Sequence, residues 1–499
     1  MIYIFFPIVL STAFFNTYHS LSFLQAKGYS MKEYWKGEKM LKIDALALLL
    51  TLAILIPSWF FSTTVKIACM IGAWLIPASS VIFKSVKFSG LNMKFTHRAG
   101  RISLVLLLVV AIVYLPIFFI KNTVFLSPIL PCLSPIYLLI SYTILSPYEK
   151  SVYKKYVNKT KERLNKKGLI KIGISGSFGK TSVKNFLLQI LSAKYKVFSP
   201  PQNYNTPMGI SKACINLNDD VQIAILEMGA RKKGDIKELM EIVSPQYGIL
   251  TGFAPQHLET FETMDNVVEE KSLVLEVPIC AYANDNLDAI STNGKIKRIG
   301  KEIEISNVTQ DSTGLSFDFR YKEINLKLHS KILGEHNAYN MALAIACALD
   351  LGVESDCIVR QVEEIKPLPH RQELIINAKG VKIIDDSYNI NLSGVISAMN
   401  TLKSFSGRKW VTAFGIVEGG EREEELNFLL GKEIGQVADY AIIVGVKYRE
   451  PIVRGIKESG NTKIYCVKDL DECKQIYVKE LEAGDNLLLL ANLPKQYLL

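Results

Sequence analysis

The chain has 499 residues, which is too long for one hydrophobic core and predicts two to four domains. Its net charge is +10, but the first 170 residues hold 20 Lys and Arg against 5 Asp and Glu, so the remainder is acidic. Because the basic residues stand between long apolar runs, they indicate the positive-inside pattern of a membrane protein and argue against nucleic acid as a partner.

Five stretches of the N-terminal third are apolar enough to cross a lipid bilayer. They cover about residues 2–24, 43–62, 66–83, 102–120 and 123–146. The loops 25–42 and 84–101 carry five Lys or Arg residues each, so both are expected in the cytoplasm. The sequence therefore predicts a multi-pass helical domain over 1–147 in the cytoplasmic membrane, with the rest of the chain in the cytoplasm. Whether this domain only anchors the chain or also forms a groove stays open.

A glycine-rich segment, Gly173-Ile-Ser-Gly-Ser-Phe-Gly-Lys-Thr-Ser182, lies between a predicted strand, Leu169–Ile174, and a predicted helix, Thr181–Leu191. Such glycines let backbone N–H groups face a phosphate, while lysine neutralises the β- and γ-phosphate oxygens and threonine ligates Mg²⁺. The strict Walker spacing is not met, because Ile174 stands where that pattern has glycine. A chance glycine-rich turn is the alternative. We predict an ATP site formed by Gly176, Ser177, Gly179, Lys180, Thr181 and Ser182.

Two further apolar strands follow this segment. Val221–Leu226 ends in Glu227, and a carboxylate at the C-terminal end of a strand in an open α/β sheet can hold the Mg²⁺ that bridges two phosphates. Tyr247–Leu250 leads toward His257. A lone histidine would more often be a structural or surface residue than a metal ligand.

Several motifs in chain order resemble those of the Mur ligases, and the MurF type most closely. They are the glycine-rich loop, Asn203-Tyr-Asn205, Glu227-Met-Gly229, His257-Leu-Glu259, Gly334-Glu-His336-Asn337-Ala-Tyr-Asn340, Pro369-His-Arg371 and Asp385-Asp-Ser-Tyr-Asn-Ile-Asn391. The resemblance implies an α/β fold with a P-loop central domain over 148–368 and a Rossmann-like C-terminal domain over 369–499. The membrane domain over 1–147 then stands where the family has a UDP-binding domain.

The resemblance also implies roles for single residues. Lys271 follows His257 by fourteen residues, a spacing that in the MurF type separates a metal-binding histidine from a lysine carbamylated by CO₂. A solvated lysine on a helix over 265–276 is the alternative. By the same matches the catalytic residues are Lys180, His257 and Lys271, and the metal ligands are Thr181, Glu227, His257 and Lys271. The nucleotide would also contact Asn340, Arg371 and Asp386, and the substrates would face Asn203, Asn205, Tyr388, Asn389 and Asn391.

The implied activity is an ATP-dependent ligase that activates a carboxylate as an acyl phosphate and joins it to an amine, with two Mg²⁺ ions. The setting is peptidoglycan or a related cell-wall precursor, with a nucleotide- or lipid-linked peptide as carboxylate and an amino acid or dipeptide as amine. A membrane ligase similar to poly-γ-glutamate synthetase is the first alternative. A nucleotide-binding membrane regulator or transporter, and a degenerate scaffold, are the others.

Overall fold

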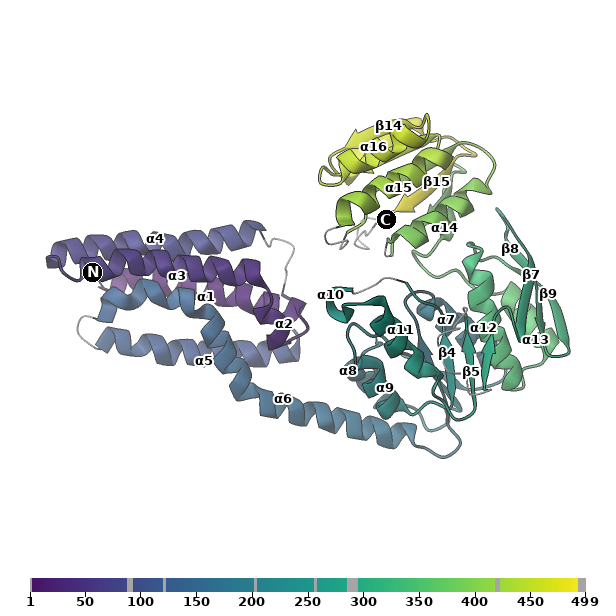
Figure 1. Cartoon of the computed structure of the whole chain (residues 1–499), viewed down its shortest axis with the longest axis horizontal. Coiled ribbons are helices and arrows are strands. Elements are labelled where there is room, and N and C mark those ends of the chain that lie inside the picture. Colours follow the sequence, from purple (N-terminus) through teal and green to yellow (C-terminus); the bar gives the residue numbers. More distant parts are fainter. Residues whose placement is uncertain are drawn as a thin grey trace. The chain divides into compact units, whose positions relative to one another are not determined.

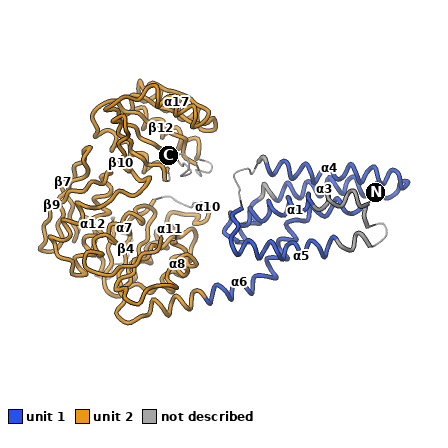
Figure 2. Tube along the Cα trace, turned by 180° about the vertical axis from the view of Figure 1, so that it is seen from behind, with its two compact units in different colours: residues 1–155 blue, residues 156–499 orange. Residues whose placement is uncertain are grey.

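The computed structural model describes residues 2–87, 93–119, 123–201, 204–254, 258–284, 295–388, 390–417 and 422–491. The chain divides into two compact units, a helical unit over Met1–Lys155 and an α/β unit over Tyr156–Leu499 (Figure 2). The predicted boundary at 147/148 falls inside one long helix that continues to Leu164.

The helical unit consists, in its described part, of helices only (Figure 1). These are α1 (Ile2–Ala26), α2 (Met31–Trp35), α3 (Glu38–Ser58), α4 (Thr63–Lys87), α5 (His97–Phe119), the 3₁₀-helix η1 (Thr123–Leu133) and α6 (Ser134–Leu164). Four stretches of the described residues are long and apolar enough to cross a membrane, judged by length and composition alone. They are Leu41–Ser58, Thr63–Ser85, His97–Tyr114 and Phe125–Leu164. The first predicted span, 2–24, falls on α1, whose first nine side chains lie outside the described residues.

The last predicted span, 123–146, is not one regular helix. Its first part forms the 3₁₀-helix η1, and α6 begins only at Ser134. Pro128 and Pro131 lie inside η1 and have no backbone N–H, so neither can donate to the carbonyl four residues earlier. An α-helix through this stretch would therefore lack two of its backbone hydrogen bonds.

A buried ion pair joins the helices of this unit. Lys84 of α4 contacts Asp44 of α3, and their side chains are 0% and 4% exposed. Lys84 also donates from Nζ to Asn16 Oδ1 of α1 at 3.0 Å, and Asn16 Nδ2 donates to the Pro131 carbonyl at 2.9 Å. This network therefore connects α1, α3, α4 and η1.

Replacement of Lys84 by alanine is expected to lower the free energy of unfolding by about 3–5 kcal/mol, because Asp44 would remain buried without its partner. The thermal unfolding midpoint of the purified chain measures the loss. The exposed Lys27 provides the control, and Lys27→Ala should unfold like the unmodified chain. Equal midpoints for both variants would contradict a structural role of the pair.

The first sheet of the α/β unit is parallel throughout, with strand order β2-β3-β1-β4-β5-β6. Its strands are β1 (Ile170–Ser175), β2 (Val197–Phe198), β3 (Ile223–Glu227), β4 (Tyr247–Leu250), β5 (Cys280–Ala283) and β6 (Ile296–Arg298). The order reverses at β1, which lies between β3 and β4. In such sheets the crevice beyond the carboxyl ends of the strands at this point binds ligands.

Helices cover both faces of this sheet, as the apolar strands require (Figure 1). They are α7 (Lys180–Ser192), α8 (Pro207–Cys214), α9 (Asp235–Val243), α10 (Leu258–Phe261), α11 (Met264–Ser272), the 3₁₀-helix η2 (Leu273–Leu275), α12 (His336–Asp350) and α13 (Ser355–Glu363). A three-stranded antiparallel sheet packs beside them. Its strands are β7 (Ile303–Asp311), β8 (Gly314–Tyr321) and β9 (Ile324–Ser330).

The C-terminal part has its own sheet, with strand order β10-β11-β15-β12-β13-β14. The strands are β10 (Glu373–Ile376), β11 (Lys382–Asp385), β12 (Lys409–Ala413), β13 (Tyr440–Val444), β14 (Lys463–Val467) and β15 (Asn486–Leu490). All pairs are parallel except β10 with β11. The helices are α14 (Leu392–Lys403), α15 (Glu423–Val437), α16 (Arg449–Ser459) and α17 (Leu470–Glu480). The α/β fold class predicted from the sequence is confirmed.

Candidate active site

The glycine-rich loop joins β1 to α7 at the point where the strand order reverses. Gly176 and Gly179 have φ angles of 143° and 75°. A Cβ atom at Gly176 would lie 2.1 Å from Thr251 Oγ1, and one at Gly179 would lie 2.6 Å from Asn340 Oδ1. Both positions therefore require glycine, for conformation and for space. The loop leads directly into the N-terminus of α7, where backbone N–H groups can receive phosphate.

Lys180 is the first residue of α7 and lies against this loop. Its Nζ donates to the Gly176 carbonyl at 2.6 Å. Burial lowers the pKa of the Lys180 ammonium, while the nearby Glu227 carboxylate raises it and Arg371 lowers it further. The predicted phosphate-binding lysine is thus within electrostatic reach of the predicted metal ligand.

Glu227 is buried at the end of β3 and faces α7. It accepts a hydrogen bond from Thr181 Oγ1 at 3.0 Å and another from Asn205 Nδ2 at 3.2 Å. Lys184 Nζ lies 3.7 Å from the same carboxylate. Hydroxyl and carboxylate oxygens are the ligands that Mg²⁺ prefers, so Thr181 and Glu227 suit this ion. Lys184 was not predicted, although its position one helical turn after Lys180 was a usable signal.

Lys271 is buried on α11, with 2% of its surface exposed. Its Nζ donates to Ser177 Oγ of the glycine-rich loop at 2.9 Å. Desolvation, followed by the charge of Lys180, lowers the pKa of Lys271 to about 7. The alternative of a solvated lysine is therefore wrong. The predicted helix over 265–276 is shorter than expected, since α11 ends at Ser272 and η2 follows.

Asn340 lies on the other side of the loop, in the first turns of α12. Its side chain is buried, and its Oδ1 occupies the space that a Cβ atom at Gly179 would need. Its Nδ2 donates to Asn337 Oδ1 at 3.1 Å. Asn337 in turn donates to the Leu333 carbonyl at 2.7 Å. This chain of amides fixes Asn340 beside the loop, as a nucleotide contact would require.

The segment before β10 brings a second group of predicted residues together. The Arg371 guanidinium lies 4.3 Å from the centre of the Tyr388 ring. Burial raises the pKa of Asp386 to about 7, although Arg371 opposes the shift. Arg371 also contributes to the lowered pKa values of Lys180 and Lys184, so its charge reaches the glycine-rich loop.

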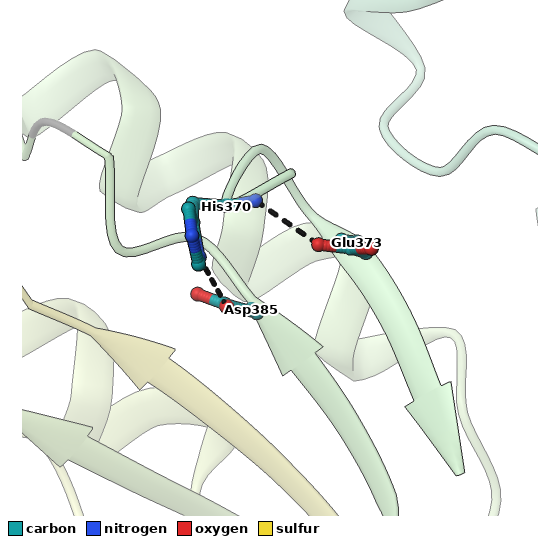
Figure 3. Close-up of side chains that lie close together, drawn as sticks. All are labelled: His370, Glu373 and Asp385. Atoms are coloured by element: carbon teal, nitrogen blue, oxygen red, sulfur yellow. Dashed lines mark hydrogen bonds and ion pairs between the residues drawn. The ribbon is translucent and has the colours of Figure 1, made fainter. Parts of the chain in front are cut away.

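His370 has a φ angle of 64°, in the left-handed region of the backbone that favours glycine. Figure 3 shows how the side chain is held: His370 Nδ1 lies 2.7 Å from Asp385 Oδ2, and its backbone N–H donates to Glu373 Oε2 at 3.2 Å. These contacts offset a backbone cost of about 1–2 kcal/mol. His370, Glu373 and Asp385 have the ligand types of a metal site, but their mutual hydrogen bonds account for the arrangement.

The remaining predicted residues have mixed outcomes. Asn205 donates from Nδ2 to Glu227 Oε1 at 3.2 Å, and its predicted contact with the substrates stays a prediction. The side-chain oxygen of Asn391 accepts the Gly394 N–H at 2.9 Å and is the N-cap of α14, a structural role that the motif did not indicate. Ser182 is buried on α7. Asn203, His257 and Asn389 lie outside the described residues, so their roles stay predictions.

Comparison with known families agrees with this geometry. The Mur ligase middle domain matches residues 174–348, and the Mur ligase glutamate ligase domain matches residues 370–493. Together they cover more than half of the chain. The chain therefore contains the middle and C-terminal domains of a Mur ligase, and the resemblance drawn from the motifs is confirmed for these two domains.

Individual relatives are of the MurF type. The UDP-N-acetylmuramoyl-tripeptide–D-alanyl-D-alanine ligase of Bacillus subtilis is 27% identical over 288 residues, which are 56% of this chain and 62% of that protein. That of Borreliella burgdorferi is 25% identical over 334 residues, 64% of this chain and 71% of the relative. The chain thus spans less than two thirds of the length of the Bacillus subtilis relative.

Solved structures share the fold. MurF from Acinetobacter baumannii has a TM-score of 0.61 at 22% identity, covering 68% of this chain and 78% of that one. MurF from Thermotoga maritima, in complex with ADP, has a TM-score of 0.60 at 23% identity, covering 68% and 80%. At this level of identity the likeness establishes a common fold.

Proposed function

We propose that this protein is a MurF-type ligase, which uses ATP to join D-alanyl-D-alanine to the free carboxylate of a UDP-N-acetylmuramoyl-tripeptide. The observation that supports the proposal most strongly is that the side chains of Lys180, Glu227 and Lys271 all contact residues of one glycine-rich loop. The names of the relatives and the ADP complex of the Thermotoga maritima protein support the choice of substrates.

The proposed reaction has two steps. A carboxylate oxygen of the peptide forms a bond to the γ-phosphorus of ATP, and the bond from that phosphorus to the β–γ bridging oxygen breaks, which leaves ADP and an acyl phosphate. The amine nitrogen of the dipeptide then attacks the acyl carbon. Phosphate departs with the former carboxylate oxygen, and the nitrogen loses a proton.

Residues of the loop bind and orient the nucleotide in this proposal. The backbone N–H groups of the loop and the Lys180 ammonium hold the β- and γ-phosphates. Thr181 and Glu227 would hold Mg²⁺, and the ion would supply positive charge beside the transferring phosphoryl group. Asn340 and Asp386 contact the adenosine, and Arg371 reaches the ribose or the γ-phosphate.

After carbamylation, Lys271 would supply a ligand to a second Mg²⁺. Carbamylation requires the neutral amine, and an unmodified ammonium would repel a cation. Burial lowers the pKa of Lys271 to about 7, so the neutral amine is well populated near neutral pH. The resulting carbamate is an anion with two oxygens, and His257 is the predicted second ligand to the same ion.

The helical unit lies in the cytoplasmic membrane in this proposal, and the α/β unit lies in the cytoplasm where ATP is available. The four apolar helices and the two basic loops support this arrangement. The unit stands where the family has a UDP-binding domain, so a lipid-linked carboxylate is the alternative to a UDP-linked one.

A reporter fused after Pro147 is expected to face the cytoplasm, because both strongly basic loops are assigned to that side. A cytoplasmic fluorescent reporter should be active there, and a periplasmic phosphatase reporter at the same position should be silent. The reverse pattern would place the α/β unit outside the cytoplasm, where ATP is not available, and would contradict the proposal.

The substrate test uses the full-length chain with ATP and D-alanyl-D-alanine. UDP-linked and lipid-linked muramoyl-tripeptides are offered separately, and mass spectrometry follows the products. The proposal expects the UDP-linked pentapeptide, together with ADP. Product from the lipid-linked peptide alone would identify a lipid, and not UDP, as the carrier of the substrate. If the dipeptide is added to neither peptide, the MurF assignment is refuted.

A further inference from the structure

Glu270 and Lys271 are consecutive residues of α11, and their side chains contact different parts of the protein. Lys271 reaches the glycine-rich loop through Ser177 Oγ at 2.9 Å. Glu270 is equally buried, with 3% of its surface exposed, and its carboxylate faces the N-terminus of α9. Successive residues of a helix differ by about 100° around its axis. One rotation of α11 therefore determines both contacts.

The Glu270 carboxylate accepts three backbone hydrogen bonds from the first turn of α9. The donors are the N–H groups of Gly234 at 2.8 Å, Ile236 at 2.6 Å and Lys237 at 3.3 Å. The first N–H groups of a helix have no acceptor within it, and the N-cap residue of α9 is Gly234, which has no side chain to supply one. Glu270 takes the place of a capping side chain, and its negative charge suits this end of the helix dipole.

The other contacts of α11 constrain its rotation less, and its ion pair to the segment before α9, between Glu269 and Lys233, lies at the surface. Val267 is fully buried in the core of the sheet domain, but apolar packing is not directional. Thr263 caps the start of α11 by accepting the Asn266 N–H at 3.2 Å, and this contact is local to the helix. The bonds of Glu270 to α9 are directional and join two separate helices.

We propose that Glu270 is a positioning residue of the active site, which holds α11 at the rotation that places the Lys271 amine beside Ser177. The proposal deepens the proposed function and rests on the role given there to Lys271. Glu270 touches neither nucleotide nor substrate and acts only through its neighbour.

The test compares Glu270→Ala with Glu269→Ala in the full-length chain. Glu269 is the matched control, since it is the adjacent glutamate, about 61% exposed, and pairs with Lys233 at the surface. Displacement of Lys271 by about 1 Å should lower kcat about 100-fold in Glu270→Ala. The affinity for ADP should change by less than about threefold, because the loop that binds phosphate is intact. Glu269→Ala should behave as the unmodified chain.

A second variant keeps the proposal testable if Glu270→Ala folds poorly. Glu270→Gln has the same shape and retains one acceptor oxygen, so the loss in kcat should be smaller, about tenfold. The double variant with Lys271→Ala provides the sharpest readout. A residue that acts only through Lys271 should cause no further loss once Lys271 is alanine.

Three results would overturn the positioning role. They are a near-normal kcat of Glu270→Ala beside an inactive Lys271→Ala, equal losses of kcat and ADP affinity, and multiplicative losses in the double variant. A near-normal kcat of Lys271→Ala would have a different meaning. It would show that Lys271 itself is not needed for the reaction, and would refute the proposed function of Lys271 together with the positioning role of Glu270.

Discussion

Replacement of Lys180 by alanine is expected to lower carboxylate-dependent ATP turnover by about 100- to 1,000-fold, because the ammonium no longer stabilises charge on the transferring phosphoryl group. Lys180 lies at the loop with its Nζ 2.6 Å from the Gly176 carbonyl. Release of phosphate in the presence of both substrates measures the effect. The fold should be preserved, because Lys180 Nζ donates only to two carbonyls of the loop beside it, those of Gly176 and Ser177.

Lys196→Ala is the matched control for this experiment. Lys196 belongs to the same domain, but its side chain is 69% exposed and pairs with Asp220 at the surface. Its removal should leave turnover unchanged. Retained turnover in Lys180→Ala, with normal unfolding behaviour, would mean that the glycine-rich loop is not the catalytic site.

The Lys271→Ala variant is expected to lose activity to a similar degree, about 100-fold or more, since the second metal ion would lose its carbamate ligand. A short-chain carboxylic acid such as propionate should partly restore turnover by occupying the space of the carbamate. In the unmodified protein, activity that depends on added bicarbonate should rise as the pH passes upward through about 7, where the Lys271 amine becomes neutral. Below that pH the ammonium dominates and carbamylation is disfavoured.

Lys233→Ala serves as the control for this second variant, because Lys233 is 61% exposed and its ion pair is with Glu269 at the surface. Carbamate can also be observed directly, as a carbon resonance from ¹³C-bicarbonate that is absent in Lys271→Ala. Near-normal activity of Lys271→Ala without any added acid would refute the role of the carbamate.

The loop and the strand end were predictable from the sequence because both depend on neighbouring residues. A strand, a glycine turn and a helix start succeed one another within Leu169–Leu191, and each is indicated by local pattern. Glu227 directly ends the buried strand β3, so its place at the carboxyl edge follows from the strand alone. Lys271 required the family spacing from His257, since a lysine on a polar helix carries no local sign of burial.

Contacts between distant segments were not predictable in the same way. The capping of α9 by Glu270 joins residues 34 apart in the chain and depends on how two helices pack. The N-cap role of Asn391 was hidden because the motif suggested a substrate contact. His370 has a left-handed backbone conformation, and its side chain contacts Asp385 on β11. No local sequence pattern indicates this contact.

Transfer of oxygen from the carboxylate to phosphate tests the central claim most directly. The full-length chain is incubated with ATP, D-alanyl-D-alanine and a UDP-linked tripeptide whose acceptor carboxylate carries ¹⁸O, and the phosphate is examined by mass spectrometry. Since the acyl phosphate keeps a carboxylate oxygen that leaves with phosphate, each turnover should release one phosphate containing ¹⁸O and one amide product. Release of unlabelled phosphate would mean that ATP is hydrolysed by water at this site, and would contradict the assignment of the chain as a ligase.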